Sequence, residues 1–177
     1  DENAKYVCVR MFDTDFNGEL SEREAARVTN EQLERLFTAP KSFRTFNEFR
    51  YFIGITKLPD NFFQDCTLLA SIKLPEGLTS IGESAFDGCS SLTTIHIPEG
   101  VTSIGNYAFR DCSSLTSINI PAEVTSIGSS TFYGCSNLVS IDLLAGLTSI
   151  GDRAFYGCSS LASIDLPAGL TSIGDRA

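Results

Sequence analysis

The chain has 177 residues, of which 42% are hydrophobic and 20% are charged, and its formal net charge is −9 with a pI near 4.5. This apolar content suffices to bury a core and argues against global disorder. The acidic balance argues against nucleic-acid binding, which needs a basic stripe on the protein surface, and against adhesion to anionic lipid. No stretch approaches the run of about 20 apolar residues that crosses a bilayer, so we expect no direct membrane insertion.

The N-terminus does not have the form of a secretory leader. Asp1, Glu2 and Asn3 are the opposite of its basic and apolar start, so the chain is cytosolic or a leader has been removed. Six cysteines would usually indicate disulfides in a secreted chain. Five of them recur at one fixed step, however, which indicates a repeat.

Residues 13–24, DTDFNGELSERE, match the calcium-loop pattern D-x-[DN]-x-[DN]-G-x5-E at every defined position. Such a loop binds the ion through side-chain oxygens at positions 1, 3, 5 and 9, the carbonyl of position 7 and a bidentate glutamate at position 12. The predicted calcium ligands are therefore Asp13, Asp15, Asn17, the carbonyl of Glu19, Ser21 and Glu24. The loop is similar to EF-hand and dockerin-like loops, which usually occur in pairs, whereas this chain has one copy.

Helical segments are expected on both sides of this loop. The apolar residues upstream share one helical face: Val7, Cys8, Met11 and Phe12. Downstream, a helix can begin within residues 22–28, and Thr29 is a candidate N-cap for the next. Aromatic residues that suit the core of a cap then follow: Phe37, Phe43, Phe46, Phe49, Tyr51 and Phe52. We predict a helical cap over residues 1–54. We expect calcium to stabilise this cap rather than to act as a signalling switch.

A unit of 23 residues fills the rest of the chain and is clearest over 101–123, VTSIGNYAFRDCSSLTSINIPAE. Other copies begin at Ile55, Leu78, Val124, Leu147 and Leu170. A period of 20–29 residues with an LxxIxI segment is typical of leucine-rich repeats, whose units stack their apolar faces. We predict an α/β repeat fold, a right-handed leucine-rich-repeat solenoid over 55–177. Because the last copy is truncated, we also expect a longer parent chain.

Each unit is expected to contain two short strands and a turn. In residues 92–97 apolar and polar residues alternate, which predicts a strand with Thr94 and His96 pointing outward. A second short strand is expected on the opposite side at residues 101–104, and a turn or single helical turn at 105–112. One aromatic per unit should form an inward ladder: Phe63, Phe86, Phe109, Phe132 and Phe155.

The motif LTSIGxxAFxGCSSLxSIxLP closely resembles the BspA-type leucine-rich repeats of bacterial surface and secreted proteins. The resemblance covers residues 55–177, although Thr131 replaces the alanine and Asp65 and Asp111 replace the glycine. It implies extracellular adhesion or host contact, and hence a secreted or cell-surface location with the signal peptide removed.

The repeated cysteines are predicted to be free, buried thiols. Cys66, Cys89, Cys112, Cys135 and Cys158 occupy one position of the unit, so they project in parallel rather than toward each other. Their spacing matches no zinc pattern of paired cysteines. Cysteine readily serves as a small core residue, and Cys8 is expected to face the core of the cap.

One outward position of the sheet changes from unit to unit while its surroundings stay nearly constant. We name it the outward stripe, and it consists of Lys73, His96, Asn119, Asp142 and Asp165. A column of small hydroxyl residues runs beside it, and together they suit polar protein or glycan contacts. Ordinary solvated positions free to vary are an equally good interpretation. A second candidate is the pair of outer tyrosines Tyr133 and Tyr156.

The sequence thus predicts a non-enzymatic binding scaffold that recognises a host or extracellular protein or glycan. One alternative is a structural spacer that displays a further domain beyond Ala177. Another is a hydrolase that uses His96 with Ser71 or Ser117. The column neighbours of His96 are Lys73 and Asn119, so the acid that would orient its ring is missing.

Overall fold

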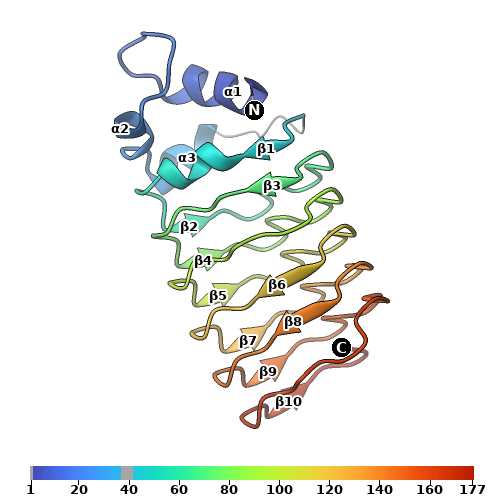
Figure 1. Ribbon diagram of the computed structural model, residues 1–177. Helices are drawn as coiled ribbons and strands as arrows, with labels where there is room; N and C mark the ends of the chain where they lie inside the picture. The colour runs from blue at the N-terminus through green and yellow to red at the C-terminus, as the bar shows by residue number, and fades with distance from the viewer. Residues whose placement is uncertain (1, 37–41) are drawn as a thin grey trace.

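The computed structural model describes residues 2–36 and 42–177. Helices gather at the N-terminal end, and a stack of short strands and turns runs from there to the C-terminus (Figure 1). The helices are α1 (Glu2–Phe12), α2 (Glu22–Ala25), α3 (Asn30–Leu36) and the 3-10 helix η1 (Asn47–Tyr51). Phe37, expected in the cap core, lies outside the described residues.

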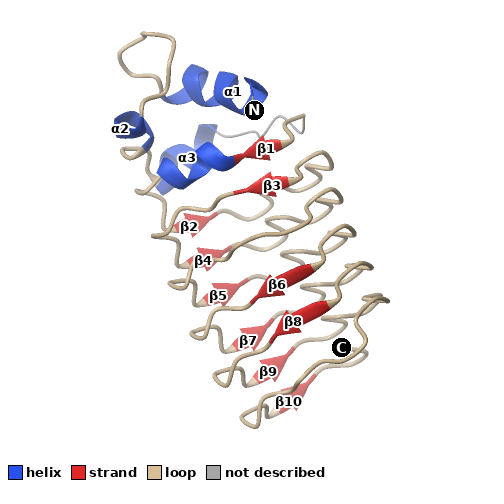
Figure 2. Ribbon diagram, in the orientation of Figure 1, coloured by secondary structure: helices blue, strands red, loops and turns tan. Residues whose placement is uncertain are grey.

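The strands form two columns that descend the stack side by side (Figure 2). The front column contains β1 (Thr45–Phe46), β3 (Ser71–Ile72), β6 (Ser117–Asn119) and β8 (Ser140–Asp142). The rear column contains β2 (Lys57–Leu58), β4 (Ser80–Ile81), β5 (Ser103–Ile104), β7 (Ser126–Ile127), β9 (Ser149–Ile150) and β10 (Ser172–Ile173). The rear column is the second short strand predicted opposite the LxxIxI segment.

Pairing in both columns is parallel and keeps the repeat in register. In the rear column Ile81 lies opposite Ile104, and in the front column Ile118 lies opposite Ile141. Identical positions of successive units therefore stack directly on one another, with the isoleucines buried and their neighbours outward. The structure confirms the predicted leucine-rich-repeat solenoid.

The cap supplies the first strand of the front column. Within the segment expected to be cap, β1 pairs in parallel with β3, so that Phe46 lies opposite Ile72. The ring of Phe46 also lies 6.4 Å from that of Phe63, the first phenylalanine of the repeat ladder. The core of the cap and the core of the solenoid are therefore continuous, and all of these rings are buried: Phe43, Phe46, Phe49, Phe52 and Phe63.

Helix α2 is shorter than the range suggested by the sequence, because it ends at Ala25. Ala26 is its C-cap, and α3 begins four residues further on, at Asn30. Thr29 lies at the N-cap position of α3, as predicted: the amide of Gln32 donates to the Thr29 hydroxyl at 3.3 Å, and the Thr29 amide donates to the Gln32 side chain at 3.0 Å.

The phenylalanine ladder is confirmed along its whole length. Ring centroids of consecutive members are 5.3, 5.3, 5.6 and 5.5 Å apart, and the last three pairs are within 8° of parallel. Backbone hydrogen bonds between units also hold the ladder. The amide of Phe86 donates to the carbonyl of Ala108 at 2.8 Å, and the amide of Phe109 donates to the carbonyl of Thr131 at 2.9 Å. The ladder is thus the central column of the core.

The cysteines are free, as predicted, and pack beside this ladder. Each thiol from Cys89 onward donates to the carbonyl of a phenylalanine in the preceding unit, as in Cys112 Sγ to Phe86 O at 3.2 Å. Burial raises the pKa of the Cys112 thiol well above its usual range, and that of Cys158 to about 11. The thiols act as core residues that also satisfy a carbonyl.

Turns join the two strand columns. At one turn position the motif has glycine, but two units have aspartate there instead. Asp65 and Asp111 have left-handed φ angles of 56° and 54°, like Gly88 and Gly134 at 73° and 72°. The carboxylate of Asp65 lies 2.8 Å from where a Cβ on Gly88 would be, and the carboxylate of Asp111 occupies the same place at Gly134. Glycine in the unit that follows such an aspartate therefore leaves room for the carboxylate, whereas a Cβ there would require the carboxylate to move.

Replacing a central ring of the ladder is expected to destabilise the whole stack. Phe109→Ala removes a fully buried ring that stacks on two neighbours, and should lower the free energy of unfolding by about 3–5 kcal/mol in a urea titration. Thr125→Ala, at an exposed position of the same region, should change it by less than about 0.5 kcal/mol. Equal effects of the two substitutions would contradict a central role for the ladder.

Candidate functional site

The middle of the outward stripe lies on paired backbone of the front column. Pairing between β6 and β8 sets Asn119 beside Asp142, and the bridge between Thr94 and Ser117 sets His96 beside Asn119. All members of the stripe are exposed: Lys73, His96, Asn119, Asp142 and Asp165. The isoleucines between them are inward, so the rigid core fixes where each of these side chains leaves the surface.

Two hollows flank the middle of the stripe. One has a volume of about 260 Å³ and is lined by Thr94, Ile95, His96, Ser117, Ile118 and Asn119. The other has a volume of about 160 Å³ and is lined by His96, Ile97, Glu99, Asn119, Ile120, Pro121, Asp142 and Leu144. We call the second one the acidic hollow. His96 and Asn119 line both, so they form the ridge between them.

The acidic hollow contains residues that the sequence interpretation did not select. Glu99 follows the proline that ends its strand, and Leu144 takes the place of that proline in its own unit. Leu144 is 43% exposed, although it is a large apolar residue. The sequence does mark this place, because position 144 is leucine whereas the corresponding position is proline in the units on both sides.

The geometry gives the hydrolase interpretation no support. His96 and Ser117 line one hollow, but His96 makes no hydrogen bond to a serine or to a carboxylate among the described residues. A serine nucleophile requires a base within hydrogen-bond reach and an acid that orients the base.

The tyrosine pair forms a compact cluster on the outer turns. The rings of Tyr133 and Tyr156 are stacked at 5.3 Å and 15°, and the guanidinium of Arg110 lies 5.6 Å from the ring centre of Tyr133. Arg110 also pairs with Asp111 at 3.3 Å. The facing sides of the rings are already in contact, so this pair offers edges and hydroxyl groups rather than an open aromatic platform.

The predicted calcium loop brings together carboxylates from its two ends. Ligand oxygens of Asp13, Asp15 and Glu24 all lie within 4.8 Å of one another. Asp13 is held in place by the amides of Phe16 at 2.7 Å and Gly18 at 2.9 Å. Gly18 has a φ of 85°, the left-handed turn that position 6 of the pattern requires. This set of hard oxygen ligands fits calcium or magnesium.

Glu24 also holds the start of α2. Its side chain accepts from the Ser21 amide at 3.0 Å and the Ser21 hydroxyl at 2.8 Å, and from the Thr14 amide at 2.8 Å and hydroxyl at 2.9 Å. The amide of Glu24 donates in turn to the Ser21 hydroxyl, which completes a capping box. These hydrogen bonds, chiefly that from the Ser21 backbone, lower the pKa of Glu24 to about 2.

The side chains of the other predicted ligands Asn17 and Ser21 form hydrogen bonds with neighbouring residues of the same loop. The Asn17 side chain accepts from the amide of Glu19 at 2.8 Å and donates to Asp15 at 3.0 Å. Ser21 is the N-cap of α2. Three of the six predicted ligands therefore converge, and the structure keeps the others within the same turn.

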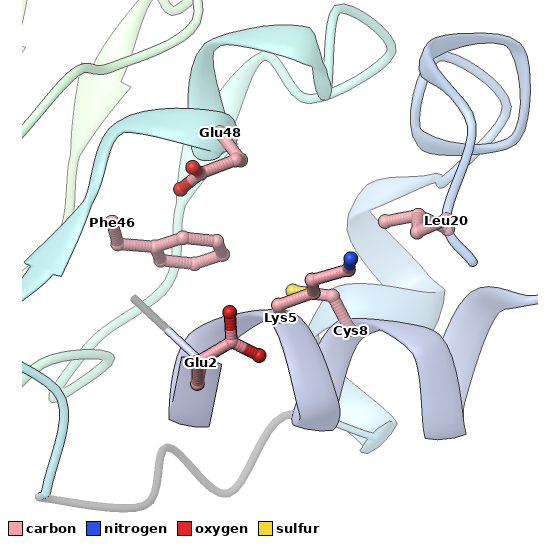
Figure 3. Close-up of a pocket in the computed structure, with 6 residues that line it drawn as sticks. All are labelled: Glu2, Lys5, Cys8, Leu20, Phe46 and Glu48. Carbon is pink, nitrogen blue, oxygen red and sulfur yellow. The ribbon is translucent and has the colours of Figure 1, made fainter. Parts of the chain in front are cut away.

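A further hollow of about 210 Å³ lies in the cap, between α1 and the β1–η1 segment (Figure 3). It is lined by Glu2, Lys5, Cys8, Leu20, Phe46 and Glu48. The thiol of Cys8 lies at its floor, where burial, with a smaller contribution from Glu48, raises the pKa of the thiol to about 12. Cys8 faces the cap core, as predicted.

The family described as BspA type Leucine rich repeat region matches residues 56–177, in six copies. The chain belongs to this family. Among solved structures, a T. pallidum leucine-rich-repeat protein is 34% identical with a TM-score of 0.62, over 73% of this chain and 65% of that one. A leucine-rich cell surface protein of Faecalibacterium prausnitzii A2-165 is 34% identical with a TM-score of 0.62, over 68% of this chain and 33% of that one.

A third solved structure, of a leucine-rich-repeat protein of Bacteroides ovatus, is 28% identical with a TM-score of 0.58, over 71% of this chain and 38% of that one. This chain therefore spans less than two thirds of the length of each of these proteins. No curated protein is similar to it. Among the described residues, no helix is long and apolar enough to cross a membrane.

The hydrogen bonds to Glu24 predict an acid-sensitive cap. Because its pKa is about 2 in the folded chain and about 4.3 in an unfolded one, its contribution to stability is present above pH 4.3 and is lost as the pH falls toward 2. In calcium-free buffer, an NMR titration should show the Glu24 carboxyl titrating near pH 2. A Glu24 midpoint at or above about 4.3, the value in an unfolded chain, would refute the prediction.

Proposed function

We propose that this chain is a non-enzymatic binding scaffold whose outward stripe contacts a host or extracellular protein or glycan. Leucine-rich-repeat proteins are generally non-enzymatic binding scaffolds, and the family match supports this class for the chain. The F. prausnitzii relative is named a cell surface protein, which supports a secreted or cell-surface location.

One observation carries the proposal. The stripe varies in charge and hydrogen-bonding character from unit to unit, while the buried positions on both sides of it repeat almost unchanged. All of its side chains are exposed, and paired backbone holds Asn119 beside Asp142. Preorganised polar groups of this kind give specificity without the cost of ordering a loop.

Arrays of glycans and of extracellular proteins test this proposal. Asn119→Ala combined with Asp142→Ala should lower the affinity for any ligand found by at least about fivefold, as expected for residues near the centre of an interface. Thr125→Ala combined with Ser126→Ala, at exposed positions on the rear side, is the matched control. A ligand that both double variants bind equally well would exclude the stripe, and no ligand on either array would favour the spacer.

We further propose that one calcium ion binds the loop of residues 13–24 and stabilises the cap. The converging carboxylates, the left-handed glycine and the agreement with the loop pattern support it. Three carboxylates close together repel one another, and a divalent cation removes this repulsion. Since the cap contributes β1 to the front column, the ion would stabilise the first edge of the solenoid.

Calorimetric titration and melting curves test the calcium proposal. Native protein should give heat on calcium addition and melt at higher temperature with calcium than with chelator; saturation at 100 times the dissociation constant corresponds to about 2.7 kcal/mol. Glu24→Gln should abolish both effects. Glu22→Gln, which changes the same charge two residues earlier, should keep them. Native protein without heat of binding and without a melting shift would refute the proposal.

A further inference from the structure

We infer that the acidic hollow beside the stripe binds a lysine or arginine side chain of an extended, basic segment of a partner protein. This inference rests on the proposed function of the stripe as a binding surface and names the chemistry of the ligand. It is carried by the lining of the hollow and by the charge of the repeats around it.

The rim of the hollow is polar and anionic. Carboxylates of Glu99 and Asp142 line it from two different units, and His96 and Asn119 complete the rim. Glu99 and Asp142 are both exposed, and neither forms an ion pair with a cation among the described residues. Asp165 follows Asp142 in the stripe, which extends the acidic edge toward the C-terminal end. A cationic group at this place meets carboxylates from two sides.

The surrounding charge reinforces this preference. Residues 56–177 contain twelve acidic and five basic side chains, all of them in the described part of the chain. None of these five basic side chains lines the hollow: Lys57, Lys73, Arg110, Arg153 and Arg176. The potential therefore attracts a basic partner and repels sulfated, phosphorylated or otherwise anionic ligands.

The floor of the hollow distinguishes a basic side chain from a bare cation. Ile97, Ile120 and Pro121 line the hollow but are buried, so its exposed apolar surface comes chiefly from Leu144, which is 43% exposed. Lysine and arginine lay an apolar stem on such a surface while their charged head reaches polar groups. Among the described residues, the one group of three converging acidic ligands is that of Asp13, Asp15 and Glu24, so the hollow lacks the oxygen set of a metal site.

Asn119 gives the site a means of holding an extended chain. Its side chain stands on the ridge between the two hollows and carries both a donor and an acceptor. A peptide backbone that crosses this ridge can use both groups while its basic side chain enters the acidic hollow. The occupant that fits is therefore a basic segment of a protein rather than a free amine.

The test uses a labelled peptide of alternating lysine and alanine, with a peptide of alternating glutamine and alanine as reference, in fluorescence anisotropy at 0.15 M salt. The native chain should bind the lysine peptide more tightly. Glu99→Gln combined with Asp142→Asn should weaken that binding about three- to tenfold, the loss of two exposed ion pairs. Glu34→Gln combined with Glu83→Gln removes the same charge at distant exposed positions and should change it less than about twofold.

Two results would overturn the inference: no preference of the native chain for lysine over glutamine, or equal weakening by the two double variants. The second result would mean that net charge alone attracts the peptide. Melting temperatures of both variants should match the native value, because all four side chains are exposed. If the arrays give a ligand that depends on Asn119 and Asp142 while the lysine preference is absent, the stripe remains a binding surface and only its basic ligand is rejected.

Discussion

Hydrogen bonding between neighbouring units, in both directions along the stack, is the constraint on which the rest of this structure depends. At the turns the bonds run forward, as from the Phe86 amide to Ala108, whereas in the rear column they run backward, as from Thr102 to Thr79. Backbone groups buried in this way are costly to leave unpaired. Each unit must therefore keep its length and phase, which explains why the same residues recur at the same positions.

This constraint separates residues that hold the fold from residues that are free to differ. Phenylalanine and isoleucine positions contact their counterparts in adjacent units, and each thiol from Cys89 onward donates to a phenylalanine carbonyl of the preceding unit, so a change in one unit affects its neighbours. The outward stripe follows the same backbone register, but among the described residues no side-chain hydrogen bond or ion pair joins its members. Chemical variety accumulates there at little cost to stability, and the acidic hollow lies where the variable stripe meets the end of the strands.

Much of the fold could be predicted from the sequence because each feature is a property of one unit. The two strand columns, the ladder and the free thiols all follow from the period and the alternation of apolar residues. The strand Thr45–Phe46 could not be predicted, since it lies outside the repeat and is defined only by its pairing with Ser71–Ile72. The acidic hollow was missed for a similar reason: Glu99 and Asp142 belong to different units and meet only after stacking.

The sequence predicts a calcium loop over residues 13–24 because the ligand spacing of this pattern is local, and the structure adds that Glu24 also caps a helix. The placement of an aspartate in one turn against a glycine in the next bears on how such an array evolves. Deleting the unit that contains Gly88 would set Asp65 directly against Asp111, so the Asp65 carboxylate would have to move to make room for the Cβ of Asp111. A change in repeat number therefore has a steric cost that depends on which two turns it brings together.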